Sequence, residues 1–287
     1  MVHMRVLKRK KGKKFYFYLQ YSFRENGKVV TKEKYLGSEV PKNIDLIKEE
    51  IEQAQKSRIY SKLRKIKDNF QKEWKTIPES AKERELQEIS IAFTYNTNAI
   101  EGSKITLSET REILSDKMAP KKPLMDVKET ESHAKIFLEV LIKREDVTRA
   151  SLLGWHKEIF GETKNDIAGI FRSYLIRVGS YVAPDWQDVK KLMGVFIEFI
   201  NKSKLNPVEL AARAHYRFEK IHPFGDGNGR IGRILMNHIL WHAGYPMLII
   251  EYKKRKSYYK ALEKDEEGFV KYFIRKYLSV HKKRLGS

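Results

Sequence analysis

The sequence HPFGDGNGRIGR, residues 222–233, joins two stretches with helical hydrophobic spacing and decides how the chain is organised around it. Apolar residues lead up to it at three- and four-residue intervals from Leu210 to Ile221. Ile231, Leu235 and Ile239 continue that spacing after it. The pattern predicts one helix that ends at the motif, a glycine-rich loop, and a second helix that begins near residue 229.

The loop between these helices has the residues of an anion-binding site. Its glycines allow a ligand to approach the backbone closely, and the N–H groups of the second helix point toward such a ligand. Arg230 and Arg233 lie on one face near that helix start, where two cations repel each other unless an anion lies between them. Asp226 fits a polyphosphate site once Mg²⁺ is added, because Mg²⁺ is usually held by a carboxylate, phosphate oxygens and water. His222 is the only group of the motif that accepts a proton near neutral pH.

The motif resembles HPF-x-(D/E)-GNGR-x-x-R, the defining motif of the Fic (filamentation induced by cAMP) family, and it agrees at all nine fixed positions. The resemblance extends over residues 85–280. Residues 169–172 and the segment Val178, Gly179, Ser180 and Tyr181 resemble the family's flap, which positions the target side chain. Residues 243–246 and 257–262 resemble the segments that close over the adenine.

This resemblance implies an adenylyltransferase that moves AMP from Mg²⁺·ATP to a Ser, Thr or Tyr hydroxyl of a target protein, which includes the chain itself. It implies that His222 is the base and that Asp226 holds Mg²⁺ against the α- and β-phosphates. The other implied nucleotide contacts are Gly227, Asn228 and Gly229 at the α-phosphate, Arg230 at the α/β region, Arg233 at the γ-phosphate, and Tyr258 and Tyr259 beside the nucleotide. Relatives often carry a polar amide where this chain has residues 265–267, Asp-Glu-Glu, so an adenine contact at that turn is left open.

Residues 97–102, TNAIEG, resemble the inhibitory motif (S/T)-x-x-x-E-(G/N) that some Fic proteins carry ahead of the main motif. Gly102 is expected just past a helix end, so Glu101 lies in the last turn, where the helix dipole disfavours a negative charge. The resemblance nominates Arg233 as the cation that balances Glu101. It therefore implies an internal inhibitor, and also a second activity in which Glu101 orients water to remove AMP. The alternative is a solvated glutamate at a frayed helix end.

We expect a mainly α fold, with a Fic-type helical core and a β-hairpin flap, preceded by a small β-hairpin module and a long helix. Residues 1–42 form the β module, because two β-prone runs within residues 15–36 flank Asn26-Gly27, a strong hairpin signal. Residues 43–80 form a helical arm interrupted by Pro78, and residues 81–284 form the Fic domain with the inhibitory helix at its start. Helices are expected near residues 82–101, 107–115, 125–143, 148–160, 185–202, 206–221, 229–243 and 255–281.

The charge of the chain indicates its partners less specifically. It has 58 Lys+Arg against 37 Asp+Glu, a net charge of +21, which attracts polyanions or reflects a charge-rich thermophile-like surface. Basic runs at residues 8–14 and 253–256, with the aromatic residues of the β module, make nucleic acid an open partner for that module.

No run approaches the roughly 18 apolar residues of a membrane span. With no cysteine and no signal peptide, we expect a cytoplasmic protein without a membrane partner. The oligomeric state is not indicated.

Two other functions are compatible with these patterns. One is a Fic phosphotransferase, although Gly229 keeps the GNGR pattern of AMP transfer. The other is a protein that senses nucleotide or binds nucleic acid on a Fic scaffold. His238 and His242 have metal-ligand spacing, but no third ligand follows nearby, which favours ordinary structural histidines.

Overall fold

The computed structural model describes residues 3–25, 28–179 and 181–286, and the chain divides into two compact units, residues 1–65 and 66–287. The boundary between the units falls inside helix α1 (Ile44–Thr76). This charged helix ends two residues before Pro78, which cannot donate the backbone hydrogen bond that a continuing helix needs.

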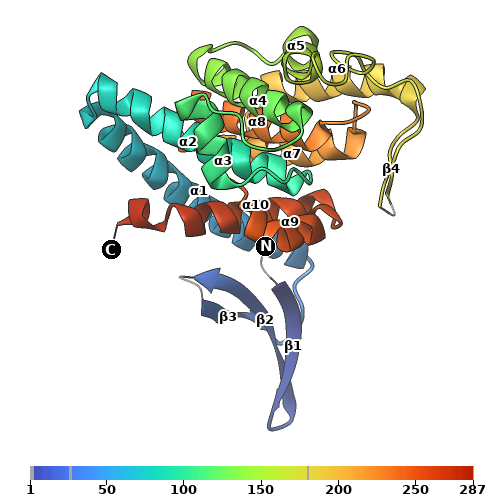
Figure 1. Cartoon of the computed structure of the whole chain (residues 1–287). Coiled ribbons are helices and arrows are strands. Elements are labelled where there is room, and N and C mark those ends of the chain that lie inside the picture. Colours follow the sequence, from blue (N-terminus) through green and yellow to red (C-terminus); the bar gives the residue numbers. More distant parts are fainter. Residues whose placement is uncertain (1–2, 26–27, 180, 287) are drawn as a thin grey trace. The chain divides into compact units, whose positions relative to one another are not determined.

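The first unit contains a three-stranded antiparallel sheet in the order β1-β2-β3 (Figure 1). Its strands are β1 (His3–Lys11), β2 (Lys14–Glu25) and β3 (Lys28–Gly37). The expected pair of strands within residues 15–36 is present as β2 and β3, and the Asn26-Gly27 turn lies outside the described residues. The sequence reading missed β1, because its lysines and arginines indicate only a charged run.

The second unit is helical apart from the short β4–β5 pair (Figure 1). Asp185 and Asn206 cap α6 and α7, each accepting a hydrogen bond from a backbone N–H two residues on, and Pro207 occupies the first position of α7. The helices are α2 (Glu79–Ile100), α3 (Leu107–Arg111) with a π-helical turn η1 (Glu112–Asp116), α4 (Leu124–Ile142), α5 (Arg149–Phe160), α6 (Trp186–Lys202), α7 (Pro207–Ile221), α8 (Asn228–His242), α9 (Arg255–Leu262) and α10 (Glu266–Val280).

The region from residue 255 to 281 differs from the single helix we expected. It forms two helices, α9 and α10, separated at residues 263–265. The Asp265 side chain accepts a hydrogen bond from the Gly268 N–H at 2.8 Å and so starts α10 as its N-cap. A capping residue inside an otherwise helical pattern is easily overlooked, because the hydrophobic spacing continues through it.

Helix α8 is the centre of the second unit. Every residue from 228 to 240 is buried, and α8 packs against α7, α4, α2 and α5 (Figure 1). A helix that is buried on all sides needs partners along its whole length. The motif at its N-terminus is therefore held by several elements at once. Within the described part of the chain, no helix combines the length and apolar character needed to cross a bilayer.

Candidate active site

His222 terminates α7 in a left-handed backbone conformation, with φ of 51°. Such a conformation is unfavourable for a non-glycine residue and needs support from its surroundings. The His222 N–H donates to the Phe218 carbonyl at 2.9 Å, which closes the helix. The Nδ1 of His222 lies 3.3 Å from the Glu219 carbonyl, an arrangement in which Nδ1–H donates and Nε2 is the acceptor. Burial lowers the pKa of His222, so the imidazole is neutral at pH 7 and able to act as a base.

Arg172 holds His222 in this conformation. Arg172 is 4% exposed, and its guanidinium donates to four backbone carbonyls, those of His222 (2.8 Å), Tyr174 (2.8 Å), Pro184 (2.6 Å) and Ile221 (3.4 Å). These bonds link the end of α7 to the residues just before and just after the flap. The sequence placed Arg172 only within the flap region, and nothing in its spacing reveals the anchoring bonds.

Asn228 closes the loop that follows His222. Its amide accepts from the Phe224 N–H and donates to the Phe224 carbonyl, both at 2.9 Å, so the side chain spans the loop as a backbone pair would. Gly227 has φ of 76°, and a Cβ there would collide with the ring of Phe160. The loop can therefore only be formed with glycine at this position. Asn228 is 2% exposed and contacts the loop itself, so the loop presents mainly its backbone outward.

His156 connects the loop to α5, and no pattern in the sequence indicates this role. Its Nε2–H donates to the Asp226 carbonyl at 3.0 Å, and its Nδ1 accepts from the Gly169 N–H at 2.9 Å. The ring also stacks on Phe224, with centroids 3.9 Å apart. Burial lowers the pKa of His156 to about 4, which keeps the one-donor, one-acceptor form that both bonds need.

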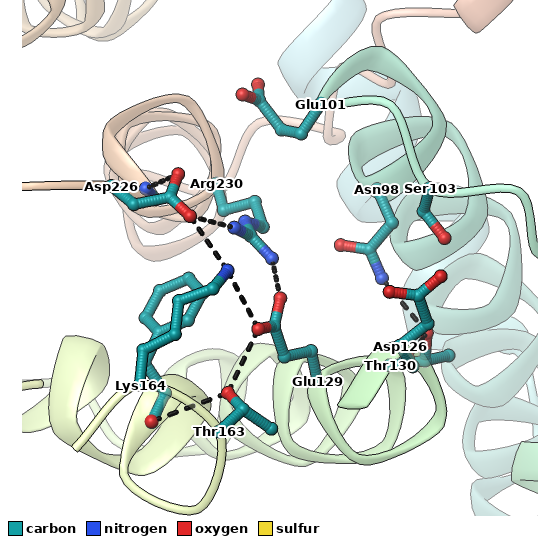
Figure 2. A network of polar contacts seen from close by, with 12 residues as sticks. Asn98, Glu101, Ser103, Asp126, Glu129, Thr130, Thr163, Lys164, Asp226 and Arg230 are labelled. Atoms are coloured by element: carbon teal, nitrogen blue, oxygen red, sulfur yellow. Dashed lines mark hydrogen bonds and ion pairs between the residues drawn. The ribbon is translucent and has the colours of Figure 1, made fainter. Parts of the chain in front are cut away.

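Four charged side chains meet beside the loop (Figure 2). Asp226 Oδ2 lies 2.8 Å from Lys164 Nζ and 3.4 Å from an Arg230 nitrogen. Glu129, from α4, is paired with Arg230 and with Lys164, the latter at 2.9 Å. Burial alone would raise the pKa of Asp226, but the neighbouring Arg230 and Lys164 charges hold it below its usual value. The sequence reading identified Asp226 and Arg230 but missed Glu129 and Lys164, which lie far from the motif in the sequence.

Glu101 reaches Arg233, as the resemblance suggested. Glu101 follows the last residue of α2, and its Oε1 lies 2.6 Å from Arg233. The Arg233 side chain is 1% exposed and also donates to the Thr97 carbonyl at 3.3 Å. The carboxylate lies directly over Gly229 at the start of α8, where a Cβ would collide with it. The segment of residues 97–102 and the glycine-rich loop are thus in direct contact.

The two tyrosines named from the sequence have different surroundings. Tyr258 is 1% exposed, and its hydroxyl lies 2.8 Å from His215 Nε2 and 3.5 Å from Arg233. Tyr259 is 42% exposed and donates to the Ile100 carbonyl at 2.9 Å. Tyr258 therefore lies behind Arg233, whereas Tyr259 reaches the surface at the end of α2.

The flap consists of two short strands, β4 (Arg177–Val178) and β5 (Tyr181–Val182), which are antiparallel. Gly179 has φ of 60°, as a tight turn requires, and Ser180 lies outside the described residues. The Tyr181 hydroxyl donates to the Lys220 carbonyl at 2.7 Å, near the end of α7. This bond positions the flap beside His222.

The donor set of this site fits a polyphosphate with a divalent metal. The buried Nε atoms of Arg230 and Arg233 have no hydrogen-bond acceptor within the described chain, which leaves donors for an anion. No group of three metal-ligating side chains occurs in the described ranges. A Mg²⁺ ion that shares one carboxylate, Asp226, with phosphate oxygens does not require such a group.

These features define a helical domain in which a glycine-rich loop lies between a neutral histidine and a carboxylate paired with a buried arginine. Residues 146–240 match the Fic/DOC family. The protein adenylyltransferase Fic of Nematostella vectensis is 36% identical over 200 residues, which cover 67% of this chain and 47% of that protein. The protein of the same name from Drosophila willistoni is 36% identical over 208 residues, which cover 68% of this chain and 41% of that protein. The chain thus spans less than half the length of these curated relatives.

Solved structures give the same result. A Fic-domain-containing signaling protein from Bacteroides thetaiotaomicron superposes with a TM-score of 0.67 at 25% identity, over 80% of this chain and 97% of that one. A fragment of Fic-1 from C. elegans gives a TM-score of 0.69 at 26% identity, over 82% of this chain and 73% of that one. The chain belongs to the Fic/DOC family.

Proposed function

We propose that this chain is a protein adenylyltransferase, with His222 as general base and ATP as the AMP donor. The observation that supports this most is a neutral His222 with an available Nε2, held at the mouth of an arginine-lined loop that begins a buried helix. The curated relatives named above carry the same activity in their names. The reaction consumes ATP, and the proposed location is the cytoplasm.

In this reaction, His222 Nε2 accepts the proton of a Ser, Thr or Tyr hydroxyl as its oxygen attacks the α-phosphorus, and pyrophosphate leaves. The backbone of Gly227 and Gly229 and the start of α8 stabilise the charge on the α-phosphate. Arg230 binds the α/β region and Arg233 the γ-phosphate. Asp226 would hold Mg²⁺, which would neutralise part of the phosphate charge.

The flap is the proposed binding site for the target. Its two short strands have open edges to which an extended protein segment can add as a further strand. Val178 and Val182 are 46% and 49% exposed and offer apolar contacts at that edge. The Tyr181–Lys220 bond holds the flap beside His222, so a hydroxyl on the added segment comes within reach of the base.

Glu101 is the proposed inhibitor. While it is paired with Arg233, Arg233 is not available to the γ-phosphate, so ATP binds weakly or in a pose that does not react. The position of the carboxylate over Gly229 supports this, because it occupies the space above the start of α8. The same carboxylate is placed to orient a water molecule for the removal of AMP, a second activity that we propose for this site.

The transferred group distinguishes AMP transfer from phosphate transfer. We expect the Glu101→Gly variant with Mg²⁺ to incorporate label from α-³²P-ATP into protein, including itself, and none from γ-³²P-ATP. The reason is that the loop positions the α-phosphate next to His222. Label from γ-³²P-ATP alone would identify a phosphotransferase, and no label from either, with added candidate targets, would argue for a nucleotide sensor.

The N-terminal sheet supports a second candidate function, the binding of single-stranded nucleic acid. Residues 1–42 contain 12 Lys and Arg against 3 Asp and Glu. One face of the sheet carries Tyr16, Tyr18 and Tyr35, whose ring centroids lie 5.3–6.2 Å apart, with the Arg9 guanidinium 4.8 Å from the Tyr18 ring. Aromatic rings next to cations suit the stacking of bases and the neutralisation of phosphates.

The opposite face of the sheet provides the control for this candidate. Leu19 and Phe23 are buried there, so these two side chains are not available for bases. We expect the full chain to bind a fluorescein-labelled oligothymidine, with an affinity that falls as salt rises. Tyr18→Ala with Tyr35→Ala should weaken binding by about tenfold or more, because each stacked base contributes roughly 1–3 kcal/mol. Lys34→Ala, which changes charge on the other face, should have a smaller effect. Equal losses in the two variants, or preferential binding of duplex, would contradict base stacking.

A further inference from the structure

Lys164 is a partly buried lysine, 27% exposed, to which the proposed reaction assigns no role. Its Nζ lies between two carboxylates, 2.8 Å from Asp226 Oδ2 and 2.9 Å from Glu129 Oε1 (Figure 2). Its backbone is fixed just past α5 by a 2.7 Å hydrogen bond from its N–H to the Phe160 carbonyl. The Nζ also lies 5.1 Å from the centroid of the Phe160 ring. Lys164 is therefore held in place on several sides, unlike an ordinary surface lysine.

We propose that Lys164 is a positioning residue that competes with the divalent metal for Asp226 and takes over Glu129 when Arg230 turns to the nucleotide. This inference rests on the proposed function, because it concerns the metal and phosphate contacts of that reaction. It assigns a role to a residue that lies outside the Fic motif and outside the inhibitory segment.

The first part of this role follows from the position of Nζ. Asp226 Oδ2 accepts from Lys164 Nζ, so the ammonium group supplies positive charge at the oxygen where a divalent cation would bind. A divalent metal has to displace this ammonium from the oxygen to bind there. Lys164 thus keeps Asp226 in its binding position before the metal arrives, and it raises the metal concentration needed for binding.

The second part follows from Glu129. Its side chain is 9% exposed, and its partners are Arg230, Lys164 and the Thr163 hydroxyl, which donates at 2.9 Å. A carboxylate buried to this degree is strongly unfavourable without a cation. Arg230 can turn to the phosphates only if another cation stays with Glu129. Lys164 is already in contact with it and is released from Asp226 by the metal at the same step.

A single variant, Lys164→Gln, is expected to improve one property of the site and to weaken another. General damage to the site would not produce this combination. In Lys164→Gln, Asp226 loses its competitor, so less Mg²⁺ is needed for nucleotide binding. Glu129 also loses its replacement cation and retains Arg230, so the affinity for ATP at saturating Mg²⁺ falls. A purely structural role for Lys164 would weaken both properties together.

The test measures binding of a fluorescent ATP analogue by anisotropy in the full chain, in the Glu101→Gly background so that the inhibitor does not limit binding. We expect Lys164→Gln to lower the Mg²⁺ concentration for half-maximal binding by about fivefold and to raise the dissociation constant at saturating Mg²⁺ by about threefold, as for partly exposed ion pairs. Adding Glu129→Gln should restore the ATP affinity, because Arg230 is then free to leave.

The matched control is Lys128→Gln. Lys128 is on α4, and its Nζ makes a 2.9 Å pair with Glu162, but both side chains are exposed and lie outside the network. It should leave both binding parameters unchanged. A Mg²⁺ requirement that is unchanged or higher in Lys164→Gln would overturn this inference alone. Failure of the Glu101→Gly protein to bind the analogue at any Mg²⁺ concentration would overturn the proposed function as well. Thermal unfolding without ligands checks that each variant is folded.

Discussion

Replacing Glu101 with glycine is expected to raise the rate of AMP incorporation by roughly tenfold to a hundredfold. Removing one partner of a buried ion pair lowers the free energy of unfolding by about 3–5 kcal/mol, which is the scale of the interaction that holds Arg233 away from the nucleotide. Each 1.4 kcal/mol removed from the barrier corresponds to a factor of ten in rate. Only part of this energy appears in the rate, because Glu101 is 28% exposed. The measurement is the initial rate of label transfer from α-³²P-ATP, compared with that of the unaltered chain.

Glu101→Gly should also change the thermal stability of the chain, and this change shows whether the loss of the Arg233 pair causes the faster transfer. Without Glu101, Arg233 is a buried cation that has lost its carboxylate, so the variant should unfold at a lower temperature than the unaltered chain. Adding ATP with Mg²⁺ should raise the unfolding temperature of the variant more than that of the unaltered chain, because the γ-phosphate replaces the missing carboxylate beside Arg233.

Glu198→Gly is the matched control for this experiment. Glu198 makes an ion pair of the same length, 2.6 Å, with Lys202, but the two side chains are 59% and 76% exposed and lie on α6 outside the motif. Its loss should not raise transfer. Unchanged or lower transfer by Glu101→Gly, with intact folding, would reject Glu101 as the inhibitor.

Replacing His222 with alanine in the Glu101→Gly background should reduce transfer by about 10²–10⁴-fold, the usual contribution of a general base. ATP binding should persist, because the arginines and the backbone of the loop are unchanged. The pair of measurements is label transfer and binding of the fluorescent nucleotide. His242→Ala, which removes a histidine that hydrogen-bonds the Val140 carbonyl, should retain transfer.

The pH dependence gives a second check on His222. Its pKa is lowered by burial first, with the Arg172 charge adding to the effect. A base works in its neutral form, so activity should rise with pH through a value below 6.5 and then level off near neutrality. A rise centred above pH 7 would mean that another group accepts the proton.

The sequence predicted the parts of the fold that local chemistry determines. The helices expected near residues 185–202 and 206–221 are present, and the side chains of Asp185 and Asn206 start them by accepting hydrogen bonds from backbone N–H groups two residues away. The Fic-type helical core and the small flap are confirmed, as is the long helix before Pro78. The strand β1 was missed, because a run such as Lys8–Lys11 carries no alternating apolar pattern and pairs only through its neighbour β2.

The site was predicted only where its residues lie within a recognisable motif. The contacts of Glu129, Lys164, His156 and Arg172 join segments that are 50 to 101 residues apart, and each depends on the packing of whole helices. Sequence spacing cannot reveal such pairs, since residue type alone does not distinguish a buried partner from a solvated surface charge. The roles that we give to the motif residues are predictions for the experiments above.

The crowding at Gly229 has a consequence for how this activity can change by mutation. The Glu101 carboxylate lies over the backbone atoms that the nucleotide is proposed to use, so a side chain at Gly229 would obstruct both. A substitution at Gly229 is therefore not expected to remove the proposed inhibition while keeping the proposed activity. In a genetic selection for constitutively active forms, the recovered changes should cluster at the end of α2 and in its supports on α4, such as Thr130, which accepts a hydrogen bond from Asn98.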